Sequence, residues 1–205
     1  MVANQLTADA PRTDEFRRGA ESQPSRTGVD TEGHEMATEM LFLHGAGGFH
    51  DDQPLAVALA SELDAHVSMP ELPDEDMSVS AWTSAIRPHV DGLTASAVLV
   101  AHSFGASMLL ALLSTMATPP PRAFLLAMPN WGDQGWAVAD YDVTGAEPTT
   151  ALTLHHCEDD DVVPVSHVAL NQRLLPSAEV RLHEVGGHQF DGCASLVAAD
   201  IRAHS

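Results

Sequence analysis

Ser103 has around it the residue types that a catalytic nucleophile requires. It separates the apolar run AVLVA (residues 97–101) from a second apolar run that begins at Phe104. A buried strand that turns sharply into a buried helix presents such a serine hydroxyl at the edge of a sheet, and small residues two positions away on either side allow the turn. Ala101 and Gly105 are those small residues. The alternative interpretation is a serine that only caps a helix.

A carboxylate that could orient a catalytic histidine follows further along the chain. The segment LTLHHCEDDDVVP (152–164) predicts a strand that runs into four consecutive acidic residues. A catalytic histidine needs a carboxylate to fix its tautomer and to stabilise its cationic form. Asp159, Asp160 and Asp161 are each candidates for this role, and the alternative is an acidic loop that caps a helix.

The candidate general base is His188. The segment LHEVGGHQF (182–190) predicts a strand that ends at Val185, and the glycine pair after it would carry His188 to the edge of the sheet. Serine, aspartate and histidine therefore follow one another in that order, which is the order of only one of the common triad folds. This order predicts acyl transfer, in which Ser103 attacks a carbonyl carbon and His188 takes its proton.

A glycine-rich loop supplies candidates for binding an oxyanion. The segment LFLHGAGG (41–48) predicts a short buried strand followed by a flexible turn. The tetrahedral intermediate of acyl transfer carries an oxyanion that needs about two hydrogen-bond donors. The backbone N–H groups of Ala46 and Phe104 are the candidates for these donors. The alternative is a turn that merely ends the strand, since glycine permits positive φ.

Further residues near these motifs are candidates for contacting a substrate. Trp131 and Trp136 follow a predicted strand over residues 122–128, where the wall of a pocket would lie. The alternative for both is simple packing over the edge of the sheet. The full set of expected substrate-binding residues is His44, Gly45, His102, Trp131 and Trp136.

The histidines and cysteines outside these motifs do not indicate a metal or a disulfide. His155 and His156 are adjacent, so they would point to opposite faces of a strand, whereas zinc requires ligands that converge. We therefore expect no metal and no organic cofactor. Cys157 and Cys193 are too few for the disulfide framework of a small secreted domain and are expected to be ordinary thiols.

The elements that must position these residues alternate between strand and helix. Strands are predicted over residues 40–45, 66–69, 97–101, 122–128, 152–155 and 180–185, and helices over 54–63, 80–93 (interrupted or bent at Pro88), 104–116, 165–175 and 194–203. This alternation predicts an α/β fold, a mostly parallel sheet with helices on both faces. Ligands of such folds bind beyond the carboxyl ends of the strands, where every motif above falls. Residues 1–38 predict a flexible acidic tail, and residues 39–205 the folded domain.

The motifs together resemble those of the α/β-hydrolase superfamily, and more narrowly those of small serine hydrolases similar to the retinoblastoma-binding-protein-like hydrolases. The segments that carry the resemblance are HGAGG, PELPDEDMSVSAW, VAHSFGAS, LLAMPNWG, HHCEDDDVVP and GGHQF. In that family the triad acid lies four residues before the proline of D-x-x-V-P. The resemblance therefore implies Asp160 as the acid, with Ser103 as nucleophile and His188 as base. Ala101 departs from the first glycine of the family's elbow.

The motifs and the resemblance lead to one expected function and one alternative. The expected function is a carboxylesterase-like serine hydrolase without a large lid domain, which cleaves an ester or thioester of a small substrate through an acyl-serine intermediate. The alternative is a catalytically silent protein of the same fold that binds or regulates a partner, because a fold does not determine a function. Nothing in the sequence indicates an oligomeric state.

Charge and composition exclude several partners. The 205 residues include 29 acidic side chains and 9 basic ones, all of them arginine, for a formal net charge of −20. This balance disfavours nucleic acids and anionic membrane surfaces. Without a membrane-length apolar run or an apolar secretory signal, we expect a cytoplasmic protein. Acidity without lysine predicts adaptation to high salt, which screens repulsion between carboxylates; a GC-rich coding bias is the alternative explanation for the missing lysines.

Overall fold

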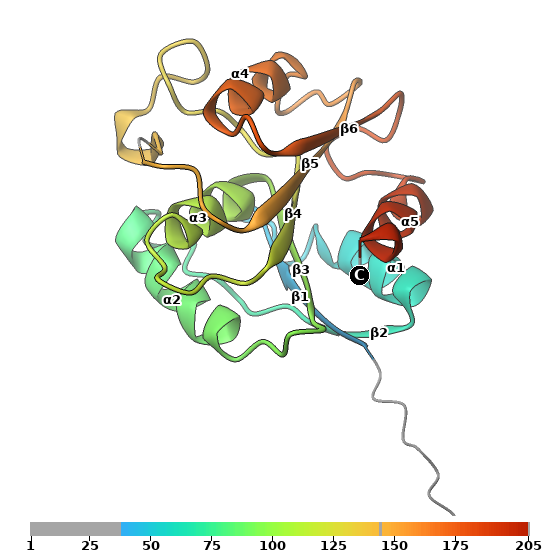
Figure 1. Cartoon of the computed structure of the whole chain (residues 1–205). Helices are drawn as coiled ribbons and strands as arrows, with labels where there is room; N and C mark the ends of the chain where they lie inside the picture. Colours follow the sequence, from blue (N-terminus) through green and yellow to red (C-terminus); the bar gives the residue numbers. More distant parts are fainter. Residues whose placement is uncertain (1–37, 144, 205) are drawn as a thin grey trace, which may run out of the picture. The chain divides into compact units, whose positions relative to one another are not determined.

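The computed structural model describes residues 38–143 and 145–204, which lie within a compact unit that spans Met36–Ser205 (Figure 1). The tail predicted over residues 1–38 therefore lies outside the described residues, except for Thr38. The described chain forms one six-stranded sheet in the order β2-β1-β3-β4-β5-β6, and every neighbouring pair is parallel. The strands are β1 Thr38–Leu43, β2 Ala65–Ser68, β3 Val98–His102, β4 Arg122–Leu126, β5 Ala151–Cys157 and β6 Glu179–His183.

Helices cover both faces of this sheet, which confirms the predicted architecture. In Figure 1, α1 and α5 lie on one face, whereas α2, α3 and α4 lie on the other. The helices are α1 Gln53–Leu63, α2 Val79–Asp91, α3 Ser103–Leu113, α4 Ser166–Leu174 and α5 Ala194–Ala203, with a short 3-10 helix, η1, at Ala139–Tyr141.

The central strands are apolar on both sides because each side faces a helix layer. Leu41 and Leu43 of β1 pack into the core beneath α2 and α3, whereas Met40 and Phe42 pack into the core beneath α1 and α5. Successive residues of a strand point to opposite faces, so a strand covered on both sides needs an unbroken apolar run. This explains why the short apolar runs of the sequence predict the strands to within a few residues.

Helix α2 runs through Pro88 without the interruption that the sequence suggested. A proline inside a helix removes one backbone hydrogen bond and leaves the carbonyl group four residues earlier without its usual partner. Pro88 and Ser84 both lie on the exposed side of α2, so water can satisfy the freed carbonyl group. The buried side chains of Trp82, Ile86 and Val90 anchor the helix on either side of the proline.

The longest connection in the described chain joins β4 to β5 and covers residues 127–150. Its described part contains η1 and otherwise irregular backbone, so no large lid domain is inserted there. Within the described ranges, no helix is both long and apolar enough to cross a membrane. The carboxyl ends of β1, β3, β5 and β6 lead into the loops that carry the four sequence motifs.

Candidate active site

Ser103 lies at a tight turn between β3 and α3. Its φ of 51° is in the left-handed region, which side chains other than glycine rarely adopt. The first turn of α3 passes so close to β1 that a Cβ atom on Gly105 would lie 2.2 Å from the carbonyl oxygen of His44. Only glycine fits at this position. The strained turn and the close helix together hold the Ser103 side chain at the carboxyl edge of the sheet.

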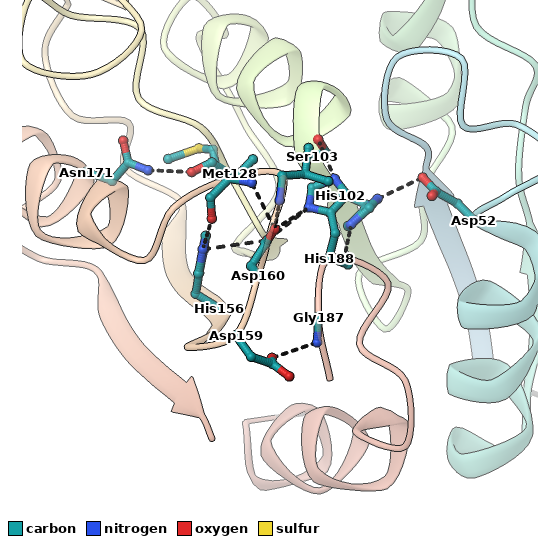
Figure 2. A network of polar contacts seen from close by, with 12 residues as sticks. Asp52, His102, Ser103, Met128, His156, Asp159, Asp160, Asn171, Gly187 and His188 are labelled. Carbon is teal, nitrogen blue, oxygen red and sulfur yellow. Dashed lines mark hydrogen bonds and ion pairs between the residues drawn. The ribbon is translucent and has the colours of Figure 1, made fainter. Parts of the chain in front are cut away.

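Ser103, His188 and Asp160 are joined by a chain of hydrogen bonds (Figure 2). The Nε2 atom of His188 lies 3.1 Å from Oγ of Ser103. The Nδ1 atom of His188 lies 2.9 Å from Oδ2 of Asp160. The three residues come from the ends of β3, β5 and β6, so parallel strands bring together side chains that are far apart in sequence. Of the three candidate acids, only Asp160 contacts the histidine ring.

The carboxyl group of Asp160 is held in its ionised form. Burial by itself raises the pKa of Asp160, but the hydrogen bond and the charge of His188 and the backbone N–H groups of Val162 and Val163 outweigh burial and lower the pKa. Oδ1 accepts both N–H groups, at 2.9 and 2.8 Å. An ionised Asp160 requires a hydrogen on Nδ1 of His188, so in the neutral form of the ring the lone pair is on Nε2, which faces the Ser103 hydroxyl.

Asp159 has a different role from its neighbour. Its two carboxylate oxygens accept the N–H groups of Gly187 at 2.8 Å and Gly186 at 3.2 Å. Gly186 and Gly187 have φ values of 139° and 58°, so the turn before His188 needs glycine at both positions. Asp159 therefore ties the loop of the acid to the loop of the base. Asp161 is exposed.

Two backbone N–H groups at the site have no protein acceptor among the described residues. They belong to Ala46, in the loop after β1, and Phe104, in the first turn of α3. Free N–H groups at a helix start and in a neighbouring loop are suited to stabilise an oxyanion. The other N–H groups of the loop are used within the protein, with Gly45 donating to Asp52, Gly47 to Asp74 and Gly48 to the Gly45 carbonyl group.

His44 and His102 do not present their rings to a substrate as the sequence suggested. The His44 ring is fully buried, and its Nε2 atom accepts the N–H of Leu72 at 2.9 Å. His102 borders the cleft, but its ring is 1% exposed and both of its nitrogens contact protein atoms. Both histidines end buried strands, so their side chains point into the packed loops beneath the site. The ring nitrogens of each histidine contact protein atoms of the loops around the site.

A cleft of about 380 Å³ opens over Ser103. Trp131 and Trp136 line it as predicted, and Gly45 contributes backbone surface. Among the described residues no arginine lines the cleft, and the carboxylates on its wall are Asp51 and Asp52. The lining residues are Gly45, Ala46, Gly48, Asp51, Asp52, Met77, His102, Ser103, Phe104, Pro129, Trp131, Trp136, Tyr141, Val162, His188 and Gln189.

The aromatic side chains of this cleft form one contiguous wall. The ring of Trp131 lies 5.7 Å from that of Phe104, 4.9 Å from that of Tyr141 and 5.0 Å from that of Trp136, all edge to face. Its Nε1–H donates to Oγ of Ser107 in α3 at 2.8 Å. The two alternatives weighed for the tryptophans are both correct in part, because the same rings pack over α3 and border the cleft.

The sequence motifs did not identify Asp52 or Gln189 as part of the site. Asp52 precedes α1 and resembles an N-cap, but its side chain makes no cap hydrogen bond and is buried against Gly45 and His102. The available signal in the sequence was the pair Asp51 and Asp52 after the glycine-rich loop, although the pair does not show which of the two side chains is buried. Gln189 could not be identified from the sequence either, since the only indication is its position next to His188.

Residues 38–143 and 145–204 contain no assembled metal site, and their two cysteines are free thiols that lie next to each other. No group of three or more His, Cys, Asp or Glu side chains there is arranged to hold a metal ion. Cys157 and Cys193 are both buried, and they are not joined by a disulfide bond. Burial raises the pKa of each thiol, which makes the reactive thiolate scarce at neutral pH.

Solved structures with the same architecture resemble this chain at low sequence identity. The ydeN gene product from B. subtilis is 16% identical with a TM-score of 0.63, over 82% of this chain and 98% of its own. Est1E from Butyrivibrio proteoclasticus is 12% identical with a TM-score of 0.64, over 85% and 89%. MGS-MChE2, an alpha/beta hydrolase enzyme from a lagoon-sediment metagenome, is 16% identical with a TM-score of 0.65, over 82% and 90%. No protein-family model and no curated protein sequence matches the chain. These likenesses show that the chain has the α/β-hydrolase fold.

Proposed function

We propose that this chain, on its α/β-hydrolase fold, is a serine hydrolase that cleaves an ester or thioester of a small substrate through an acyl-serine intermediate. The observation that carries the proposal is the continuous relay from Oγ of Ser103 through His188 to a buried, ionised Asp160. The motifs of Ser103, Asp160 and His188, which resemble those of retinoblastoma-binding-protein-like hydrolases, support the same assignment.

The mechanism begins with the attack of Ser103 on the carbonyl carbon. Nε2 of His188 takes the hydroxyl proton as the bond forms, and Asp160 stabilises the resulting imidazolium. The N–H groups of Ala46 and Phe104 donate hydrogen bonds to the carbonyl oxygen, on which negative charge develops. His188 then gives its proton to the leaving group, which departs as an alcohol or thiol. Water, activated by His188, releases the acid and restores Ser103.

The cleft favours an uncharged apolar acyl group. Its wall of Phe104, Trp131, Trp136 and Tyr141 offers aromatic surface, and its volume of about 380 Å³ suits a small group. A carboxylate or phosphate on the substrate would find no arginine partner there and would face Asp51 instead. Anionic acyl groups are therefore expected to be poor substrates.

A fluorophosphonate probe tests the nucleophile directly. The probe is expected to label the wild-type protein and Ser80→Ala, which removes an exposed hydroxyl on α2, but not Ser103→Ala. Labelling should be accompanied by turnover of p-nitrophenyl esters that both Ser103→Ala and His188→Ala abolish. Labelling of Ser103→Ala would refute the assignment. A wild-type protein that is neither labelled nor active would favour the alternative of a silent binding protein on the same fold.

A further inference from the structure

A second histidine–aspartate pair lies directly beneath the proposed triad and takes no part in its proton relay. His102 precedes Ser103 in the chain, and Asp52 precedes α1. Nδ1 of His102 lies 2.8 Å from Oδ2 of Asp52, and Nε2 lies 2.9 Å from the backbone carbonyl oxygen of His188 (Figure 2). Both residues are 1% exposed, so water does not compete for these contacts. A buried ionisable pair of this kind calls for a role.

The partners of His102 determine where its hydrogens must be. A carbonyl oxygen only accepts, so Nε2 must carry a hydrogen. The Oδ2 atom of Asp52 already accepts the N–H of Gly45 at 2.8 Å, which identifies it as an acceptor toward Nδ1 as well. Both ring nitrogens therefore carry hydrogens. With hydrogens on both nitrogens, the ring of His102 would carry a positive charge beside the carboxylate of Asp52.

Asp52 receives several donors from different segments. Its Oδ2 atom accepts from Gly45 and from His102, and its side chain is also hydrogen-bonded by that of Gln189. Burial by itself raises the pKa of Asp52, but these donors and the charge of His102 outweigh burial and lower it. The carboxylate also packs tightly against the loop, since a Cβ atom on Gly48 would lie 2.9 Å from Oδ2.

These contacts join three segments whose relative positions the proposed reaction depends on. Gly45 is next to Ala46, whose N–H is a proposed oxyanion donor. His102 is next to the nucleophile, and its second hydrogen bond ends on the main chain of the base itself. Moving any one segment would break a hydrogen bond in the low-dielectric interior, where an unpaired charge is costly.

We propose that His102 and Asp52 form a buried, charged positioning pair that fixes the backbone of His188 and the Gly45–Gly48 loop relative to Ser103. The inference rests on the proposed function, because what is positioned is the base and the oxyanion donor of that reaction. Neither residue touches the reacting atoms, so both act through the residues that they hold. Displacements of about 1 Å in such groups lower the rate of a reaction by about 100-fold, which sets the scale of the expected effect.

Two isosteric variants of His102 separate its two hydrogen bonds. Gln places its amide nitrogen near the position of Nε2 and can keep the bond to the His188 carbonyl group. Asn places its amide nitrogen near Nδ1 and can keep only the bond to Asp52. His102→Asn is expected to lower kcat by about 10- to 100-fold with KM changed less than about 3-fold, whereas His102→Gln, which loses the ion pair but keeps the bond to the main chain of the base, should lose markedly less kcat. Equal losses in both variants, or no loss in either, would overturn the proposal.

The variant Asp52→Asn tests the charge of the pair. Asparagine has the shape of aspartate and can still accept from Gly45, so a purely steric role predicts wild-type behaviour. A charged pair predicts a lower kcat than wild type, because His102 either loses a hydrogen and one of its two bonds or stays buried without a counter-ion. Wild-type kcat in Asp52→Asn would contradict the proposal. Thermal unfolding monitored by circular dichroism identifies variants that fail to fold.

Two further measurements test the proposal and do not require catalytic turnover. In the ¹⁵N-labelled wild-type protein, both ring nitrogens of His102, assigned by comparison with His102→Gln, should carry slowly exchanging hydrogens. Hydrogen exchange of the backbone over residues 186–193 should be faster in His102→Asn than in His102→Gln. Either a single ring hydrogen on His102, or equal backbone hydrogen exchange in the two variants, would contradict the proposal. If Ser103 is not labelled by fluorophosphonate while these two results hold, the proposed function fails and the positioning pair stands.

Discussion

Nδ1 of His188 lies 2.9 Å from Oδ2 of Asp160, although the two residues are 28 positions apart in the sequence. The contact is reinforced from outside the pair, since the neighbouring Asp159 accepts the N–H groups of the glycine turn that precedes His188. The acid loop and the base loop are therefore joined twice, once through side chains and once through the backbone. A variant that removes only the first link isolates the chemical role of Asp160 from its role in holding the loops.

Asp160→Asn removes the charge and keeps the shape. The amide can donate a hydrogen bond to Nδ1 of His188 and stabilise the tautomer that lacks a lone pair on Nε2. We expect kcat for p-nitrophenyl esters to fall on the order of 10³- to 10⁴-fold, as when the aspartate of a serine triad is replaced in this way. The matched control is Asp161→Asn, an exposed neighbour that should keep wild-type kcat. Similar kcat values for the two variants would argue against the triad.

Trp136→Ala tests the aromatic wall of the cleft. Trp136 is 39% exposed and packs its ring 5.0 Å from that of Trp131. Losing its apolar surface should lower kcat/KM by about 5- to 30-fold for esters of aromatic or long acyl groups, corresponding to about 1–2 kcal/mol, and by less for acetate esters. Val138→Ala, in the same segment but outside the cleft lining, is the control. A uniform loss over all acyl groups would exclude a role in acyl selection.

Gly105→Ala tests the close approach of α3 to β1. The added Cβ atom would lie 2.2 Å from the His44 carbonyl oxygen, so the backbone must shift. We expect a loss of about 3 kcal/mol or more in the free energy of unfolding, measured by urea denaturation. At Gly145 the added Cβ atom would meet only Ser114 Cβ at 3.9 Å, so Gly145→Ala should change stability by less than about 0.5 kcal/mol. Equal stabilities would mean that α3 packs less tightly than described.

The order of elements and the candidates Ser103 and His188 could be predicted from the sequence because they depend on local patterns, and the structure brings these two side chains within 3.1 Å of each other. A buried parallel strand needs an unbroken apolar run, and a strand-to-helix turn needs small residues such as Gly105. The choice of Asp160 from three neighbouring acids came from a family resemblance, and in the structure it is Asp160 that lies 2.9 Å from Nδ1 of His188. His44 was misassigned because no local pattern shows whether a histidine at the end of a strand faces a cleft or a loop.

The position of Asp52 in the site could not be predicted from the sequence. Its importance depends on contacts with Gly45 and His102, which lie on other segments, and on the exclusion of water from all three. Burial of a carboxylate is a property of the assembled tertiary structure, and a pair of adjacent acids before a helix is far more often a solvated cap. Only the three-dimensional arrangement distinguishes Asp52 from its exposed neighbour Asp51.

Stability should depend on pH through His155, which is not one of the relay residues. Burial lowers the pKa of His155 to about 4, with His183 and Arg181 adding to the effect and Asp200 opposing it. Between the ordinary value of 6.5 and about 4, the unfolded chain therefore binds a proton that the folded protein does not, so the free energy of unfolding falls as pH falls, by up to about 3 kcal/mol. In urea titrations over this range, His155→Asn should show a shallower slope than wild type. Parallel slopes would show that His155 titrates normally in the folded protein.

The excess of acidic residues leads to a prediction about salt. With a net charge of −20, repulsion between carboxylates opposes folding in dilute buffer, and at 1 M salt the Debye length of about 3 Å screens most of it. We expect Tm to rise steeply between low and molar potassium chloride. Sucrose at matched osmolality, which does not screen charge, is the control. A flat dependence of Tm on salt would leave coding bias as the explanation for the absence of lysine.

The absence of hydrogen bonds between the described segment 129–143 and the relay residues affects how this molecule can evolve. Ser103, His188, Asp160 and their supporting loops are bound to one another, so a change in any of them disturbs the others. The segment 129–143 borders the same cleft, yet no hydrogen bond of the described structure joins it to the three relay residues. Mutations in that segment can therefore accumulate and be selected for new acyl groups while the chemical apparatus is inherited unchanged.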